Sequence, residues 1–239
     1  MENSKRIELW GNVAFAVLIL VSDIIFMCGI VPKYFIKTLA SALFVLCGVF
    51  NLILCKKFYK EIFNFKPFIL LAGLVFAFLG DVLLIDYFVI GAIFFAIGHI
   101  FFLCYFISLY KITLLDCFIA IGIFISALLL ILLFKGFEFN GMKILVIVYA
   151  LIISLMLGKA LGTMITNPTN ANLVMGIGAF LFFFSDLMLL FDVFANMPKI
   201  FDYLCLITYY PAEFLLALTI LLQSKELTNI RIYENNKQK

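Results

Sequence analysis

Long apolar runs separated by short polar or helix-breaking connections dominate the sequence. The hydrocarbon core of a bilayer is about 30 Å thick, so a helix that crosses it needs roughly 20 mostly apolar residues. Runs of this kind predict eight spans, at 10–30, 38–54, 68–85, 87–110, 112–134, 141–161, 172–192 and 201–222. The pattern therefore predicts an all-α, polytopic integral membrane protein with one membrane domain over 1–239 and a short tail at 223–239.

The connections contain prolines, glycines and lysines, as at Pro32-Lys33, Lys66-Pro67 and Pro198-Lys199. Asp86-Tyr87 leaves room only for a tight turn, so the third and fourth spans should be antiparallel neighbours. No small-residue cleavage site follows the first apolar run, which we therefore interpret as a retained span rather than a signal peptide.

The basic residues are distributed unequally between the two sides of the predicted membrane domain. An even number of spans puts both termini on one side, and 12 of the 17 lysines and arginines fall on that side. They are Lys5, Arg6, Lys56, Lys57, Lys60, Lys66, Lys111, Lys159, Lys225, Arg231, Lys237 and Lys239. The positive-inside rule then predicts that both termini are cytoplasmic.

Composition excludes several classes of protein. Apolar residues make up 66% of the chain, charged residues 13%, and the mean hydropathy is +1.22. So little polar surface cannot cover a water-soluble catalytic domain, and no cluster of basic and aromatic residues suggests nucleic-acid binding. The six cysteines form neither a CxxC motif nor a Cys/His metal spacing, and we interpret them as packing residues. Any chemistry must therefore lie within the spans or at their mouths.

Two segments of the chain resemble each other at an offset of 105 residues. Residues 73–84 read GLVFAFLGDVLL and residues 178–189 read GAFLFFFSDLML. Each has a glycine, a mostly apolar stretch, and then a small residue followed by aspartate. Ser22-Asp23 in the first span is a looser third copy. The third and seventh spans run in the same direction, so a duplication would be a parallel repeat. Chance similarity between apolar helices is the alternative.

Ionisable residues inside the spans are the strongest indication of function. An aspartate at the centre of a span costs about 2.5–3.5 kcal/mol on insertion scales, and such residues usually face the interior of the bundle. The candidates are Asp23, Asp81, His99, Lys159, Asp186 and Glu213. A structural hydrogen bond is the alternative role for each of them, and Lys159 is expected to extend towards the cytoplasmic face.

Asp81 and Asp186 lie deepest, in the half of the membrane away from the termini, and each follows a small residue, Gly80 or Ser185. We expect the two carboxylates to reach one cavity, roughly 5–10 Å apart as in paired-carboxylate hydrolases. Two charges are costly in a dry pocket, so one carboxyl should hold a proton while the other stays ionised. The same pair would also suit a proton-coupled transporter.

Five segments of the chain, in order, resemble the YhhN family of membrane proteins, which includes the lysoplasmalogenases. They are GLVFAFLGDVLL (73–84), FFAIGHIFFLCYF (94–106), VYALIISLMLGKA (148–160), GAFLFFFSDLMLL (178–190) and YYPAEFLL (209–216). The resemblance extends from Lys37 to Leu222. It implies an eight-span hydrolase that cleaves the vinyl-ether bond of lysoplasmalogens, taken from the bilayer, into a fatty aldehyde and a glycerophospho-base.

The resemblance also assigns residues. It implies that Asp81 and Asp186 are the catalytic pair, with His99, Tyr209 and Tyr210 in support and with no metal or organic cofactor. One position departs from it, because Glu213 stands where the family pattern leads us to expect glutamine. Asp23 is a further supporting candidate by its depth. The expected location is the inner membrane in a bacterium or the endoplasmic reticulum in a eukaryote.

Overall fold

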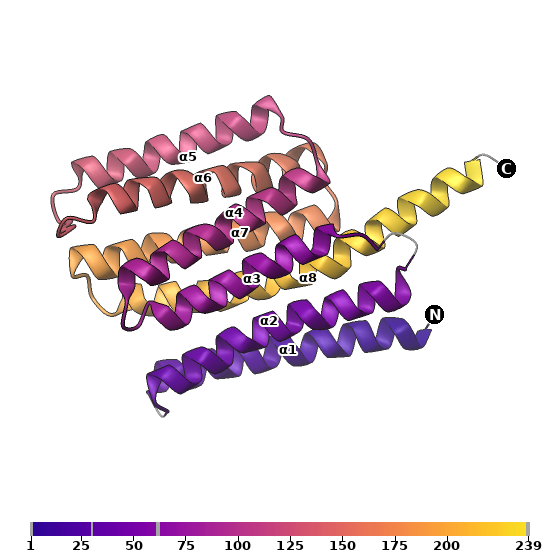
Figure 1. Cartoon of the computed structure of the whole chain (residues 1–239), viewed down its shortest axis with the longest axis horizontal. Helices are drawn as coiled ribbons and strands as arrows, with labels where there is room; N and C mark the ends of the chain where they lie inside the picture. Colours follow the sequence, from indigo (N-terminus) through magenta and orange to yellow (C-terminus); the bar gives the residue numbers. More distant parts are fainter. Residues whose placement is uncertain (1, 30, 61–62, 238–239) are drawn as a thin grey trace.

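The computed structural model describes residues 2–29, 31–60 and 63–237, and every regular element in these residues is an α-helix (Figure 1). The eight helices are α1 (Glu2–Cys28), α2 (Lys33–Phe58), α3 (Lys66–Leu83), α4 (Phe88–Leu109), α5 (Leu114–Leu133), α6 (Lys143–Thr166), α7 (Asn170–Ala195) and α8 (Ile200–Lys237). All eight are long and apolar enough to cross a membrane. The predicted all-α, multi-pass architecture is therefore confirmed.

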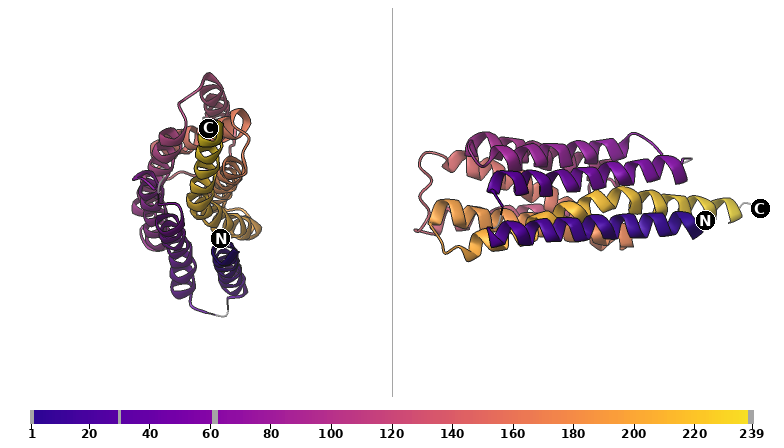
Figure 2. Two further views of the ribbon diagram at one scale, coloured as in Figure 1. Left: turned by 90° about the vertical axis from the view of Figure 1, so that its right-hand side faces the viewer. Right: turned by 90° about the horizontal axis from the view of Figure 1, so that it is seen from below.

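The helices form one antiparallel bundle with both chain ends at the same end (Figure 1). We call this the terminal end, and we call the opposite end, with the connections 84–87, 134–142 and 196–199, the distal end. The cross-section is elongated, with α1 and α2 at one extreme and α5 at the other (Figure 2). Helix α8 is central, since it packs against α1, α2, α3 and α7.

The packing of the helices follows the internal repeat that the sequence suggests. In the half formed by α1–α4 and in the half formed by α5–α8, consecutive helices pack against each other. Between the halves, α8 packs on α2 and α4 packs on α6, while α8 also packs on α1 and α3 without a counterpart at α4 among the described residues. If α1–α4 are matched in order to α5–α8, the contact of α2 with α8 corresponds to the contact of α6 with α4. The equivalence supports the interpretation of 73–84 and 178–189 as corresponding segments.

Several helices extend beyond the predicted spans. Helix α1 begins at Glu2 rather than near 10, and α8 continues to Lys237 rather than ending near 222. The predicted tail is therefore a continuation of α8 as far as the structure describes it. Polar residues in water can keep the backbone hydrogen bonds of a helix, so a helix need not end where its apolar sequence ends. At 1.5 Å per residue, the 38 residues of α8 span about 57 Å.

Glycines bring consecutive helices close together. A Cβ atom at Gly91 would lie 2.6 Å from the backbone nitrogen of Leu84, at the turn between α3 and α4. A Cβ atom at Gly158 would lie 2.7 Å from the backbone nitrogen of Ala120, where α6 meets α5. Such small residues allow close backbone contact in membranes, where dispersion contacts contribute much of the association between helices.

Lys159 has the structural role that the sequence leaves open as an alternative. Its side chain is 3% exposed, and its ammonium group lies 2.8 Å from the carboxylate of Asp116 and donates to the carbonyl of Lys111 at 2.8 Å. Asp116 also closes the first turn of α5 in a reciprocal cap with Thr113. The lysine therefore joins α6 to α5 in a buried ion pair instead of extending alone to the membrane face.

Candidate functional site

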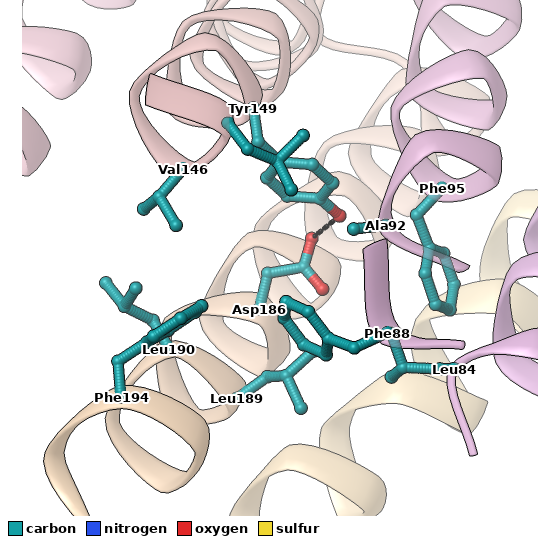
Figure 3. A pocket seen from close by; sticks show the side chains of 11 residues that line it. Leu84, Phe88, Ala92, Phe95, Val146, Tyr149, Asp186, Leu189, Leu190 and Phe194 are labelled. Atoms are coloured by element: carbon teal, nitrogen blue, oxygen red, sulfur yellow. Dashed lines mark hydrogen bonds between the residues drawn. The ribbon is translucent and has the colours of Figure 1, made fainter. Parts of the chain in front are cut away.

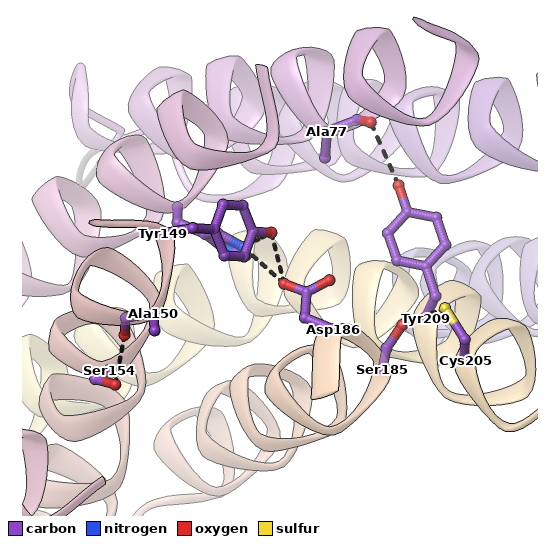
Figure 4. Close-up of polar contacts among 9 residues, drawn as sticks. Ala77, Tyr149, Ala150, Ser154, Ser185, Asp186, Cys205 and Tyr209 are labelled. Atoms are coloured by element: carbon purple, nitrogen blue, oxygen red, sulfur yellow. Dashed lines mark hydrogen bonds and ion pairs between the residues drawn. The ribbon is translucent and has the colours of Figure 1, made fainter. Parts of the chain in front are cut away.

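Asp186 on α7 is the centre of the first of two polar clusters. Tyr149 on α6 donates its hydroxyl to one carboxylate oxygen at 2.6 Å (Figure 4). The Nε2 atom of His99, on α4, lies 3.1 Å from the same oxygen and 2.9 Å from the tyrosine hydroxyl. The histidine side chain is fully buried, whereas the aspartate side chain is 11% exposed. Three groups that can exchange protons therefore meet at one point, and one of them remains accessible.

His99 is oriented by its ring contacts as well as by its hydrogen bonds. Its ring packs against Phe182 on α7, with the ring centroids 4.5 Å apart. Its second nitrogen, Nδ1, has no hydrogen-bond partner in the described part of the chain. With its proton on Nε2, the neutral imidazole can donate to Asp186. The predicted supporting residue is thus in contact with one of the two predicted carboxylates.

Asp186 and Tyr149 are the polar residues that line two otherwise apolar cavities. The first lies between α4, α6 and α7, where Phe88 and Phe194 form part of its wall (Figure 3). The second lies between α5, α6 and α7. Each has a volume of about 60 Å³, which is enough for a water molecule or a short segment of an aliphatic chain. A polar group at an apolar cavity is the usual arrangement of a small-molecule site.

Asp81 on α3 is the centre of the second cluster, and its partners are different. The ammonium group of Lys37 lies 2.8 Å from one carboxylate oxygen. The other oxygen accepts hydrogen bonds from the hydroxyl of Ser41 at 2.5 Å and from that of Tyr210 at 3.2 Å. Asp81 is 3% exposed. Three groups that can donate a hydrogen bond, one of them a cation, therefore surround this carboxyl group.

Aromatic rings lie between the two clusters. The ring of Tyr209 packs edge-on against Phe182 and Phe95, with centroid distances of 5.4 and 5.7 Å. Its hydroxyl points to the backbone carbonyl of Ala77 at 3.4 Å (Figure 4). The two tyrosines expected in support therefore do different things: Tyr210 contacts a carboxylate, and Tyr209 is one of the rings that separate the clusters. Asp81 lines neither of the two cavities at Asp186, so the expectation of one shared cavity stays a prediction.

The remaining predicted residues, Glu213 and Asp23, are buried without a full set of partners. Glu213 is 0% exposed, and neither of its carboxyl oxygens has a hydrogen-bond partner among the described residues. It lies close enough to both Asp186 and Asp81 for their charges to act on it, without a hydrogen bond to either cluster among the described residues. Asp23 is 1% exposed, lacks a partner at Oδ1, and lies within electrostatic range of Tyr210.

Three residues at the clusters were not singled out by the sequence. Lys37 and Ser41 are four positions apart on α2, so both side chains lie on the face that meets Asp81. A basic and a hydroxyl residue four positions apart at the start of an apolar helix could have indicated a polar face directed into the bundle. Tyr149 lies within a segment of family resemblance, but its hydroxyl has no distinctive sequence context.

The fold and the clusters together define a multi-pass α-helical membrane protein with carboxylates buried inside its bundle. The model of the YhhN family matches residues 32–220, and the chain belongs to this family. The resemblance noted in the sequence is thus confirmed. No curated protein and no solved structure matches the chain.

Proposed function

We propose that the protein is a membrane-embedded hydrolase that cleaves the vinyl-ether bond of lysoplasmalogens with a choline or ethanolamine head group. The observation that carries the proposal is the position of Asp186, hydrogen-bonded by Tyr149 and adjacent to His99, at two apolar cavities. Membership of a family that includes lysoplasmalogenases supports the choice of substrate.

The reaction requires an acid and a base. The acid protonates the vinyl carbon that is not bonded to oxygen, which gives an oxocarbenium ion. Water adds to the cation and loses a proton to the base, and the resulting hemiacetal collapses to a fatty aldehyde and the free glycerophospho-base. The net reaction consumes one water. Glycoside hydrolysis divides two carboxylates in the same way around an oxocarbenium-like transition state.

We assign the acid to Asp186 and the ionised carboxylate to Asp81. Among the described residues the polar partners of Asp186 are Tyr149 and His99, and its carboxyl group lies at an apolar cavity that could hold the vinyl ether, so it is placed to deliver the proton. Asp81 is beside Lys37, so as a carboxylate it would keep a counter-ion while it stabilises a cation and accepts a proton from water. Tyr149 and His99 would orient Asp186, and Tyr210 would orient Asp81.

Aldehyde release from the purified protein tests the proposal directly. The full chain in detergent should release a long-chain aldehyde from choline or ethanolamine lysoplasmalogen. It should not act on the matching lysolipid whose chain is joined by a saturated ether. Failure to release aldehyde above background with either head group, from protein that is monodisperse and folded, would reject the hydrolase.

A second function is favoured by one observation. Glu213 is buried, unpartnered and within range of both aspartates, as expected of a group that carries a proton between two sites. A proton-coupled transporter would show solute or proton flux in sealed vesicles and no aldehyde product. The two assays on one preparation therefore separate the two functions.

We also propose that both termini are cytoplasmic, because 12 of 17 basic residues lie on their side of the predicted spans. Reporter fusions at the C-terminus and within the 196–199 connection should then report opposite sides of the membrane. The same location for both reporters would contradict the eight-span topology, and reversed locations would contradict the orientation alone.

A further inference from the structure

A groove on the lipid-facing side of the bundle leads to Asp186. It lies between α5 and α7, has a volume of about 450 Å³, and is lined in part by Gly122, Ser126, Ala127, Leu130, Phe183 and Leu187. Helix α5 packs against α6, and in the described part of the chain no Cα atom of α5 comes within 8 Å of a Cα atom of α7. The groove is the space that remains between these two helices.

Small residues on α5 keep the groove open. A Cβ atom built at Gly122 would meet nothing within 4 Å. The hydroxyl of Ser126 donates to the carbonyl of Gly122 at 2.8 Å, so it already has a partner within its own helix. The other lining side chains named above are hydrocarbon. The groove therefore suits an apolar ligand that needs no hydrogen bonds.

The groove adjoins the cavity at Asp186. Ala127, Leu130, Phe183 and Leu187 line both the groove and the smaller cavity between α5, α6 and α7. That cavity has a volume of about 60 Å³, so the passage at the carboxylate is narrow. The residues of α5 that line the groove run from Leu130, near the distal end, past the middle of the helix to Ile119.

We propose that this groove holds the single aliphatic chain of a membrane amphiphile whose scissile end lies at Asp186. A narrow passage admits one chain, and a chain that runs from near the distal end past the middle of α5 has the direction of a lipid tail that enters from the distal side. The inference rests on the proposed function, because hydrolysis at Asp186 requires the reactive end of the chain there. Lateral entry from lipid needs no opening of the bundle, since the groove faces the bilayer.

Photo-crosslinking tests the groove without requiring activity. The probe is a lysophospholipid whose chain is joined by a saturated ether and carries a diazirine near its end. With the full chain in lipid nanodiscs, crosslinks should concentrate on 119–130 of α5 and 183–187 of α7, and excess unlabelled saturated-ether lysolipid should remove them. Crosslinks spread evenly over the lipid-facing helices, or unaffected by the competitor, would overturn the proposal.

A matched pair of variants on α5 sharpens the test. Gly122→Phe places a ring in the groove, whereas Ile121→Phe changes a neighbour that is 55% exposed on the lipid-facing surface. Gly122→Phe should reduce groove crosslinking about tenfold or more, and Ile121→Phe should leave it unchanged. If Gly122→Phe does not fold, Gly122→Leu fills less of the same space. Equal crosslinking in both folded variants would overturn the groove.

Enzyme kinetics provide a second, independent test of the groove. In an active protein, Gly122→Phe should raise the KM for long-chain substrates and leave a short-chain vinyl ether unaffected. If the wild-type protein releases no aldehyde but retains competed crosslinks in the groove, the hydrolase is wrong and the lipid site stands. If aldehyde is released and the crosslinks are unspecific, the groove is wrong and the hydrolase stands.

Discussion

The Asp81 and Asp186 clusters occupy equivalent positions in the two halves of the bundle but have different chemistry. Each aspartate is on the third helix of its half, α3 or α7. Each contacts the second helix of its own half, through Lys37 and Ser41 or through Tyr149. Each also contacts the fourth helix of the other half, through Tyr210 or His99. The two halves therefore place a carboxylate at the same position, but the residues that contact it differ between them.

The differences between the clusters concern charge and access. Asp81 is paired with a lysine and is 3% exposed, whereas Asp186 meets an imidazole and a phenol at the edge of two cavities. In the proposed mechanism Asp186 donates a proton to the substrate, and Asp81, beside its cation, accepts one from water. A duplicated helix pattern would then supply two carboxylates with opposite proton-transfer roles.

The largest effect should come from neutralising either carboxylate. Asp186→Asn and Asp81→Asn keep the size of the side chain but cannot transfer a proton in the same way. Each should lower the turnover of lysoplasmalogen about 10²-fold or more, the usual scale for a positioned acid or base. Thermal unfolding in detergent shows whether each variant is folded. Near-normal turnover in both folded variants would disprove the carboxylate mechanism.

Breaking the Lys37–Asp81 ion pair should lower the stability of the folded protein. Lys37→Met leaves the charge of Asp81 without its cation, and breaking a buried pair costs about 3–5 kcal/mol in soluble proteins. We expect roughly 2 kcal/mol, because the unfolded state within a membrane also finds partners for polar groups. The double variant Lys37→Met/Asp81→Asn should recover most of the lost thermal stability. A double variant as unstable as Lys37→Met would show that the pair does not stabilise the fold.

The two tyrosines should differ in their effect on turnover. Tyr149 donates to Asp186 at 2.6 Å, and Tyr210 donates to Asp81 at 3.2 Å. Tyr149→Phe should lower kcat about tenfold, since a hydrogen bond to a charged or proton-transferring group is worth about 1.5–3 kcal/mol. Tyr210→Phe should cost less, because Lys37 and Ser41 remain at Asp81. The reverse order would contradict the assignment of the acid to Asp186.

Glu213→Gln should have the smallest effect. Both carboxyl oxygens of Glu213 lack a hydrogen-bond partner in the described structure, so a neutral amide of the same shape disturbs no bond there. Glutamine is also the residue that the family pattern leads us to expect. Turnover should change less than about threefold, well below the scale of a general acid or base. A loss as large as that of Asp186→Asn would make Glu213 a catalytic group.

The sequence predicted the residues that are costly in lipid better than it predicted their partners. Asp81, His99 and Asp186 stand out because an ionisable group in an apolar run needs a reason to be there. The partners depend on how each helix is rotated. The sequences of α4 and α6 are apolar on nearly all sides, so no periodic stripe indicates which face meets the interior.

Lys37 shows this limit most clearly. The apolar pattern predicts a second span that begins at 38 and leaves Lys37 outside it, whereas α2 begins at Lys33. The lysine is therefore in the second turn of a helix, where its side chain can point inward to Asp81. Helix ends are set by capping and by contacts with neighbours, which an apolar run of residues does not record.

The ion pair between Lys159 and Asp116 has a consequence for biosynthesis. Both residues belong to one hairpin, formed by α5 and α6, and their charges neutralise each other within it. The hairpin can therefore enter the bilayer as a unit whose two opposite charges are already paired, before α7 and α8 have been made. An unpaired lysine within α6 would oppose insertion, by up to about 2.5–3.5 kcal/mol if it stood at the centre of the span. The pair thus favours insertion of the α5–α6 hairpin as one unit during synthesis of the chain.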